Sequence, residues 1–174
     1  MPSVERQRWQ ADCARYPRFP LLRCPVIWPL AVYRLRRWAR SEAPVPVRGI
    51  LAAALAPLRT AVGLMGIELP VTCDIGGGLW LPHLGPIVVH RDTVIGRNAL
   101  VRHGVTFGDR HIDGGAPVIG DDCEFGAYAQ VLGGVRIGDR VTVGALSLVL
   151  EDLPDDAVAI GIPARVVRRG QRAE

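Results

Sequence analysis

The sequence predicts a mainly β fold, a solenoid of short parallel strands preceded by an α-helical segment. Large aliphatic or aromatic residues recur at six-residue intervals between residues 69 and 153. These repeat positions are Leu69, Ile75, Leu81, Ile87, then, after a slip of two residues, Val89, Ile95, Val101, Phe107, and later Ile119, Phe125, Val131, Ile137, Val143 and Val149. Residues two apart on a strand share a face. Each repeat therefore supplies inward side chains and then turns a corner, as in stacked solenoids.

A smaller residue stands two places before many repeat positions. These residues are Cys73, Thr93, Ala99, Val105, Cys123, Ala129, Val135, Val141 and Ser147. A narrow interior agrees with the composition, because 49% of residues are hydrophobic but only 6% are aromatic. The cysteines lack metal or disulfide spacing, so Cys73 and Cys123 are interpreted as core residues in a reducing, cytoplasmic compartment. Charged residues crowd the first ten positions, and no signal peptide is expected.

The chain divides into three parts. Residues 1–66 are predicted to be helical, residues 67–156 to form the solenoid, and residues 157–174 to form a C-terminal cap or tail. Within the solenoid, residues 108–118 are polar and would place Asp113 at a buried repeat position, which is costly without a partner. We therefore expect residues 108–118 to leave the coil as an excursion loop.

Two helices are expected in the N-terminal part, from Val26 to Arg40 and from Ile50 to Met65. They would cap one end of the solenoid or pack on a neighbouring subunit. Residues 1–66 contain eleven Arg and three acidic residues, which gives +8, whereas the whole chain carries +4. This charge favours a solvated helix face, with an anionic partner or a membrane surface as the alternative. Pro and Arg residues between positions 45 and 66 argue against a membrane-spanning helix, and no nucleic-acid-binding motif is present.

Five strings of the chain resemble the hexapeptide-repeat acyltransferases, and among them the serine O-acetyltransferase group. The strings are Gly66-Ile67-Glu68-Leu69-Pro70, Leu81-Pro82-His83, Gly85-Pro86-Ile87-Val88-Val89, Ala116-Pro117-Val118-Ile119-Gly120 and Gly161-Ile162-Pro163-Ala164-Arg165. The resemblance implies a left-handed parallel β-helix, a homotrimer, and acetyl-CoA bound as a co-substrate in clefts between subunits.

Transfer of an acetyl group from a thioester to a hydroxyl requires a base, positioned substrates and donors for the oxyanion, but no metal. His83 lies two residues after Leu81, at a corner where its side chain should point outward. The resemblance implies that His83 is the catalytic base. Glu68 lies nearly one coil earlier and would orient the imidazole, although the family usually has Asp there.

The acceptor site is assigned to three residues. Arg110 and His111 belong to a Gly-Asp-Arg-His string that also occurs in the serine enzymes, where the Arg and His help to hold the amino acid. His103 lies two residues after Val101 and should also face outward. Three outward histidines raise a second possibility, the zinc site of γ-carbonic anhydrases, but Asn98 stands where that pattern needs a histidine.

The acetyl-CoA site is assigned by the resemblance to Gly126, Ala127, Gly144, Ala145 and Arg165. Small residues would let the pantetheine arm approach the backbone, and Arg165 could meet a phosphate. Ordinary solenoid geometry explains the glycines and alanines equally well.

The sequence thus predicts an acetyl-CoA-dependent O-acetyltransferase with serine as the favoured acceptor. A sugar, polysaccharide precursor or specialised metabolite is the alternative acceptor, because the N-terminal part is short for a biosynthetic serine acetyltransferase. A non-catalytic β-helix scaffold is the second alternative. The C-terminus lacks the terminal Ile that docks into cysteine synthase, so no such complex is expected.

Overall fold

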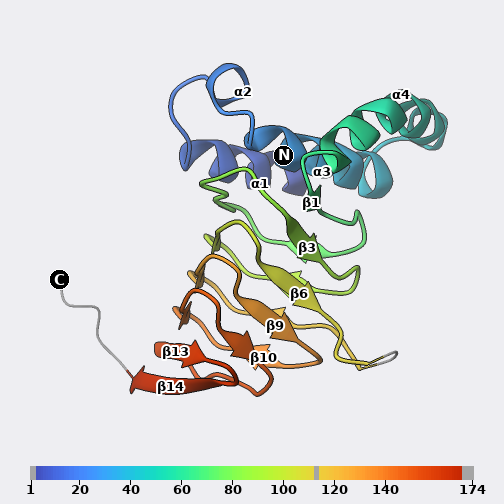
Figure 1. Ribbon diagram of the computed structural model, residues 1–174. Coiled ribbons are helices and arrows are strands. Elements are labelled where there is room, and N and C mark those ends of the chain that lie inside the picture. The colour runs from blue at the N-terminus through green and yellow to red at the C-terminus, as the bar shows by residue number, and fades with distance from the viewer. Residues whose placement is uncertain (1–2, 112–113, 170–174) are drawn as a thin grey trace.

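Four helices lie on one end of a three-sided β-solenoid in the computed structural model, which describes residues 3–111 and 114–169 (Figure 1). They are α1 (Val4–Ala14), α2 (Pro20–Arg23), α3 (Ile27–Ser41) and α4 (Val45–Gly63). The two predicted helices correspond to α3 and α4, whereas α1 and α2 were not predicted. The side chain of Ser3 caps α1 by accepting a hydrogen bond from the Arg6 backbone nitrogen.

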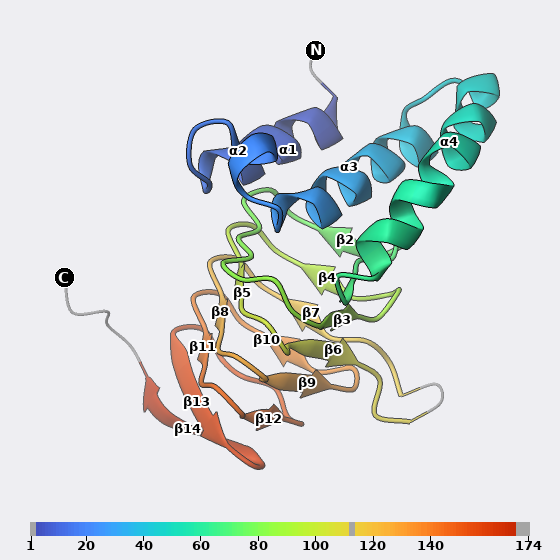
Figure 2. The same ribbon diagram turned by 45° about the horizontal axis from the view of Figure 1, so that its top comes forward.

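The strands form three sheets, here named A, B and C, which are the three sides of the solenoid (Figure 2). Sheet A contains β1 (Ile67–Glu68), β3 (Ile87–Val89), β6 (Thr106–Gly108), β9 (Gln130–Leu132) and β12 (Leu148–Val149). Sheet B contains β2 (Asp74–Ile75), β4 (Val94–Ile95), β7 (Val118–Ile119) and β10 (Arg136–Ile137). Sheet C contains β5 (Leu100–Val101), β8 (Glu124–Phe125), β11 (Thr142–Val143), β13 (Ala157–Gly161) and β14 (Ala164–Arg169).

All neighbouring strands pair in parallel except β13 and β14, which form an antiparallel hairpin. Residues 157–169 therefore begin by continuing sheet C, because β13 pairs in parallel with β11, and then fold back as β14. The mainly β solenoid with a helical N-terminal segment is confirmed. Residues 170–174, the end of the predicted tail, lie outside the described part of the chain.

The strand register locates the excursion loop. Val88 of β3 pairs with Thr106 of β6, an offset of 18 residues, but Thr106 pairs with Gln130 of β9, an offset of 24. The connection between β6 and β7 is therefore one six-residue repeat longer than a regular coil requires. The loop returns against the β9–β10 turn, where the Gly134 nitrogen donates to the Gly114 oxygen at 3.0 Å. Asp113 lies outside the described residues.

The repeat positions fill the solenoid interior, with one correction in the first coil. Ile67 is buried and pairs with Ile87, whereas Leu69 is only partly buried. Leu69 packs against the core but also lines the cavity between the first coil and the helices, which leaves it partly exposed. Every small residue predicted to face inward is also buried: Cys73, Thr93, Ala99, Val105, Cys123, Ala129, Val135, Val141 and Ser147.

The helices cap the first coil through hydrogen bonds to its backbone. The edge of a parallel solenoid leaves peptide groups without partners, and burying them unpaired is costly. Tyr33 of α3 donates to the Cys73 oxygen at 2.9 Å and accepts from the Ile75 nitrogen at 3.2 Å. Arg34 donates to the Ile75 oxygen at 2.7 Å and also bonds the Gly76 oxygen.

Asp12 of α1 completes this cap. Its carboxylate accepts from the Gly78 and Leu79 nitrogens at 2.7 and 2.9 Å, and from Arg34 Nε at 2.7 Å. Arg34 is 3% exposed and Asp12 is 0% exposed, so the interpretation of the basic helix as a solvated face is wrong at Arg34. The predicted capping role of the helices is confirmed by these contacts.

The last helix, α4, is largely exposed. It packs along α3 (Figure 2), and of its nineteen residues only Val62 is buried. With a mean hydropathy of 1.3 over its most apolar window, α4 is long and apolar enough to cross a membrane, a property that core helices of soluble proteins and signal sequences share. The expectation that residues 45–66 do not span a membrane stays a prediction.

Replacement of Asp12 by Ala should lower the free energy of unfolding by about 3–5 kcal/mol, the range for removing one partner of a buried ion pair. The variant removes the nearer of the two carboxylates that pair with Arg34 and leaves two backbone nitrogens without an acceptor. Chemical denaturation of Asp12→Ala beside the exposed control Asp92→Ala measures the difference. Equal stability of the two variants would contradict the capping role of Asp12.

Candidate functional site

One edge of the solenoid collects most of the predicted site residues. At this edge the chain turns from sheet C to sheet A, and we name it the C–A edge. Its turns lie between successive strands and include residues 82–86, 102–105, 126–129 and 144–147. They contain His83, His103, the Gly126–Ala127 pair and the Gly144–Ala145 pair. The structure therefore places the predicted base and most predicted acetyl-CoA residues along a single edge.

Three rings form a column down this edge. The His83 and His103 rings lie 5.8 Å apart between centroids and meet edge to face, with an interplanar angle of 80°. The Tyr128 ring lies 5.3 Å from the His103 ring in a similar arrangement, at 84°. His83 is exposed, as predicted, and half of Tyr128 is exposed. The column thus presents an imidazole to solvent beside a second imidazole.

Two glycines allow the rings to approach. Gly85 has φ of +153°, and a Cβ there would lie 2.7 Å from the His103 Cβ. Gly104 has φ of +77°, and a Cβ there would lie 2.6 Å from Tyr128 Cγ. Side chains at these positions would push His103 or Tyr128 out of the column, so local backbone geometry positions the three rings.

His103 has an unusual environment. Its Nδ1 atom is buried and has no hydrogen-bond partner among the described residues. Buried polar atoms are normally paired, and exceptions concentrate at functional sites. The ring is therefore held mainly by the contacts with His83 and Tyr128. Within residues 3–111 and 114–169, no group of three or more His, Cys, Asp or Glu side chains is arranged to hold a metal ion.

Tyr128 was missed by the sequence interpretation. It occupies the corner position three residues after a repeat position and has a left-handed backbone, with φ of +60°. Asn98, Asp122 and Arg140 occupy equivalent corners with the same conformation. An aromatic residue is unusual at a position that favours Asn, Asp or Gly, and that contrast could have identified Tyr128.

The glycines assigned to acetyl-CoA have a structural role. A Cβ on Gly126 would clash with the Ala145 nitrogen and lie 2.7 Å from the Ala145 Cα, and a Cβ on Gly144 would lie 2.5 Å from Ile160 Cγ2. Close stacking of neighbouring coils therefore accounts for both glycines. Ala127 is partly exposed and Ala145 is exposed, so each leaves the edge uncrowded.

Arg165 lies on β14, opposite Ile160 of the β13–β14 hairpin. Its side chain is exposed and forms an ion pair with Glu151 at 3.5 Å. Because both side chains are largely in solvent, this pair is weak and leaves the guanidinium available to an anion.

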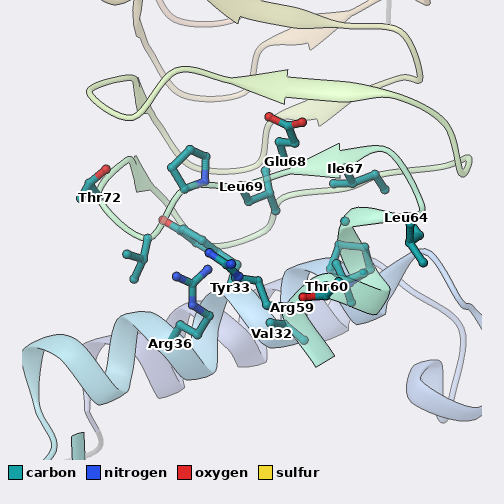
Figure 3. Close-up of a pocket in the computed structure, with 15 residues that line it drawn as sticks. Val32, Tyr33, Arg36, Arg59, Thr60, Leu64, Ile67, Glu68, Leu69 and Thr72 are labelled. Carbon is teal, nitrogen blue, oxygen red and sulfur yellow. The ribbon is translucent and has the colours of Figure 1, made fainter. Parts of the chain in front are cut away.

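Glu68 lies on β1, beside Val88 of β3, the strand that follows His83. Across the described residues, the Glu68 carboxylate forms no hydrogen bond or ion pair, and none joins it to His83. Figure 3 shows Glu68 at the border of a cavity between α3, α4 and the first coil. The predicted contact between Glu68 and His83 therefore stays a prediction.

Arg110 and His111 lie away from this column. They follow β6, at the corner between sheets A and B, whereas His103 precedes β6 at the C–A edge. Both side chains are exposed. A single protomer therefore does not bring the predicted acceptor residues Arg110 and His111 next to His83.

Comparison with known proteins identifies the fold and its relatives. The family described as bacterial transferase hexapeptide (six repeats) matches residues 116–150. A serine acetyltransferase of Helicobacter pylori is 34% identical over 96% of this chain and 95% of its own length. The serine acetyltransferase of Synechococcus elongatus is 32% identical over 88% of this chain, which spans 58% of that relative. A putative colanic acid biosynthesis acetyltransferase of Escherichia coli is 40% identical over 58% of this chain and 63% of its own length.

Two solved structures that superpose on this chain are also of serine acetyltransferases. Soybean serine acetyltransferase complexed with serine superposes with a TM-score of 0.78 at 30% identity, covering 94% of this chain and 70% of the soybean chain. The serine acetyltransferase of Brucella abortus in complex with coenzyme A gives a TM-score of 0.71 at 26% identity, covering 98% of this chain and 68% of the other.

Replacement of Gly126 by Ala should destabilise the protein by about 1–3 kcal/mol, because the added methyl group meets the backbone of the next coil. Gly49→Ala is the matched control: nothing lies within 4 Å of its added Cβ, and it stands inside α4. This control should stabilise the protein by about 0.5–1 kcal/mol through helix propensity. Thermal unfolding measures both, and a neutral Gly126→Ala would show that coil spacing does not require glycine.

Proposed function

We propose that this chain, which belongs to the serine acetyltransferase family, moves an acetyl group from acetyl-CoA to the hydroxyl of a small acceptor. The observation that carries this proposal is the exposed His83 imidazole in a ring column on the edge that also carries the Gly126–Ala127 and Gly144–Ala145 pairs. The edge leaves room for an extended thioester next to a base. A scaffold would need neither the outward imidazole nor the ring column.

His83 acts as the general base. Its neutral imidazole takes the proton of the acceptor hydroxyl as the oxygen attacks the thioester carbonyl. The tetrahedral intermediate then collapses, the carbon–sulfur bond breaks, and the protonated imidazole returns the proton to the leaving thiolate. The products are the acetyl ester and coenzyme A, and the base is regenerated.

Neighbouring groups support this base. Glu68 is proposed to orient His83 and to stabilise its cationic form, because β1 runs beside the strand that follows His83. His103 is proposed to bind the acceptor beside His83, since its ring contacts that of His83 on the same edge.

Acetyl-CoA is proposed to lie along the C–A edge. The turns at Gly126–Ala127 and Gly144–Ala145 follow each other down this edge, one coil apart, and the first of them also carries Tyr128. Arg165 would contact a phosphate near the end of the solenoid. The Brucella abortus relative binds coenzyme A, which supports the same co-substrate here.

A homotrimer would complete the acceptor site. If sheet A of each protomer faced a threefold axis, the C–A edge of one protomer would lie next to the A–B corner of its neighbour. Arg110 and His111 of the neighbour would then approach His83, which a single protomer does not achieve. We propose this arrangement, together with the predicted cytoplasmic location.

Serine is the favoured acceptor. The relatives that align with the chain over most of its length are serine acetyltransferases, and the soybean relative binds serine. The alternative, a saccharide hydroxyl, is supported by the 40% identity to the putative colanic acid biosynthesis acetyltransferase of Escherichia coli.

Replacement of His83 by Ala should lower kcat by about 10²–10⁴-fold, the usual contribution of a general base. The side chain is exposed, so thermal unfolding should be nearly unchanged. Release of the coenzyme A thiol is the measurement. Arg97→Ala, on the corner between sheets B and C, is the control and should keep its activity. Full activity of His83→Ala would remove His83 as the base.

Thiol release with serine should exceed that with any member of a panel of sugars and polysaccharide fragments, each tested at equal concentration with the wild-type protein. The product is identified by mass spectrometry as an O-acetyl ester. Faster turnover of a saccharide would replace serine with the alternative acceptor, and no turnover with any acceptor would favour a scaffold.

A further inference from the structure

A cavity of about 590 Å³ lies between the helical cap and the first coil of the solenoid (Figure 3). Its walls come from α3, from the end of α4 and from residues 64–72. Volumes of 300–1,000 Å³ are typical of small-molecule sites. Much of the lining is apolar, including Val32, Val62 and Leu69. The cavity is separate from the ring column on the C–A edge.

Two arginines reach this cavity, Arg36 from α3 and Arg59 from α4. Burial and the nearby charge of Arg59 lower the pKa of Arg36. Neither guanidinium forms an ion pair or hydrogen bond with any residue in the described ranges. The sequences of α3 and α4 contain no Asp or Glu. Two like charges therefore stand at one cavity without compensation.

The acids of the N-terminal part are engaged elsewhere. Glu5 and Asp12 pair with Arg34, and Glu5 also pairs with Arg8. Glu68 is the one acidic residue in the cavity lining, and no ion pair joins it to either arginine across the described residues. The charge at Arg36 and Arg59 is therefore available to a ligand.

We propose that this cavity binds a phosphate monoester of a small hydroxyl-bearing molecule. A dianionic phosphate would balance the two guanidiniums, whose N–H groups donate to phosphate oxygens. The hydroxyls of Thr60 and Thr72, which also line the cavity, would form hydrogen bonds with the ligand's hydroxyls. The apolar walls would contact its carbon skeleton.

Glu68 connects this cavity to the acetyl-transfer site. A bound ester would lie against β1, the strand that carries the carboxylate proposed to orient His83, so its occupancy would change turnover. That consequence rests on the proposed function, whereas binding itself does not. A binding measurement without acetyl-CoA therefore separates failure of this proposal from failure of the proposed function.

Isothermal titration of the full chain with glucose 6-phosphate, with glucose as the uncharged comparison, tests the site. The wild-type protein should bind the phosphate ester and not glucose. Arg36→Gln and Arg59→Gln should each weaken binding by about tenfold or more, which corresponds to about 1.4 kcal/mol. Arg23→Gln is the matched control, because Arg23 is exposed on α2 and outside the cavity lining.

Thermal unfolding without ligand checks that each variant is folded. Arg59→Gln removes one of two repelling charges, so its melting temperature should equal or exceed that of the wild type. Equal binding by Arg59→Gln and Arg23→Gln would overturn the proposal, and so would absence of wild-type binding both to glucose 6-phosphate and to vesicles of phosphatidic acid.

A phosphate monoester could also belong to a lipid headgroup, because Leu64 is exposed at the cavity, directly after α4, and Ile50 is exposed on α4 itself. Sedimentation with phosphatidic acid vesicles and with phosphatidylcholine vesicles distinguishes the sources. Retention on phosphatidic acid that is lost in Arg36→Gln assigns the site to a lipid. Binding of glucose 6-phosphate without vesicle retention assigns it to a soluble ester.

Discussion

Pairing of the open edge of the first coil is the constraint on which this structure depends. A parallel solenoid cannot end without leaving peptide groups unpaired, and their burial beneath helices would be costly without partners. Arg34, Asp12 and Tyr33 supply those partners from α1 and α3. Residues 1–66 are therefore part of the folding unit, since removing them would expose or orphan the backbone of the coil that leads to His83.

The positions of His83, His103 and Tyr128 follow from the stacking of the coils. Each coil repeats the turn of the coil before it. Side chains at one corner therefore stack in a column because of the repeat alone. His83, His103 and Tyr128 share the C–A edge for this reason, and Gly85 and Gly104 remove the side chains that would separate them. The excursion loop departs at a different corner. Within one protomer, solenoid geometry therefore keeps His83 apart from Arg110 and His111.

The six-residue periodicity predicted the solenoid, its inward residues and the excursion, because burial in a narrow interior imposes a strict pattern. It also predicted that His83 and His103 would point outward. It did not predict the partners of Arg34, because a basic residue on an amphipathic helix looks the same in a sequence whether it faces water or a row of carbonyl groups. α1 was missed for a related reason: its important residues, Glu5 and Asp12, are polar and buried, which contradicts the apolar pattern used to detect helices.

Helical spacing explains how α3 performs two tasks. Arg34 and Arg37, three residues apart, face the first coil, where Asp12, Glu5 and backbone carbonyls receive them. Arg36 faces α4 and Arg59 instead, without an acid. The cap uses only the face of α3 that carries Arg34 and Arg37. The other face places Arg36 near Arg59, and burial together with that like charge lowers the pKa of Arg36. Because no described residue pairs with either guanidinium, an anion from outside the chain is the group that we propose for this cavity.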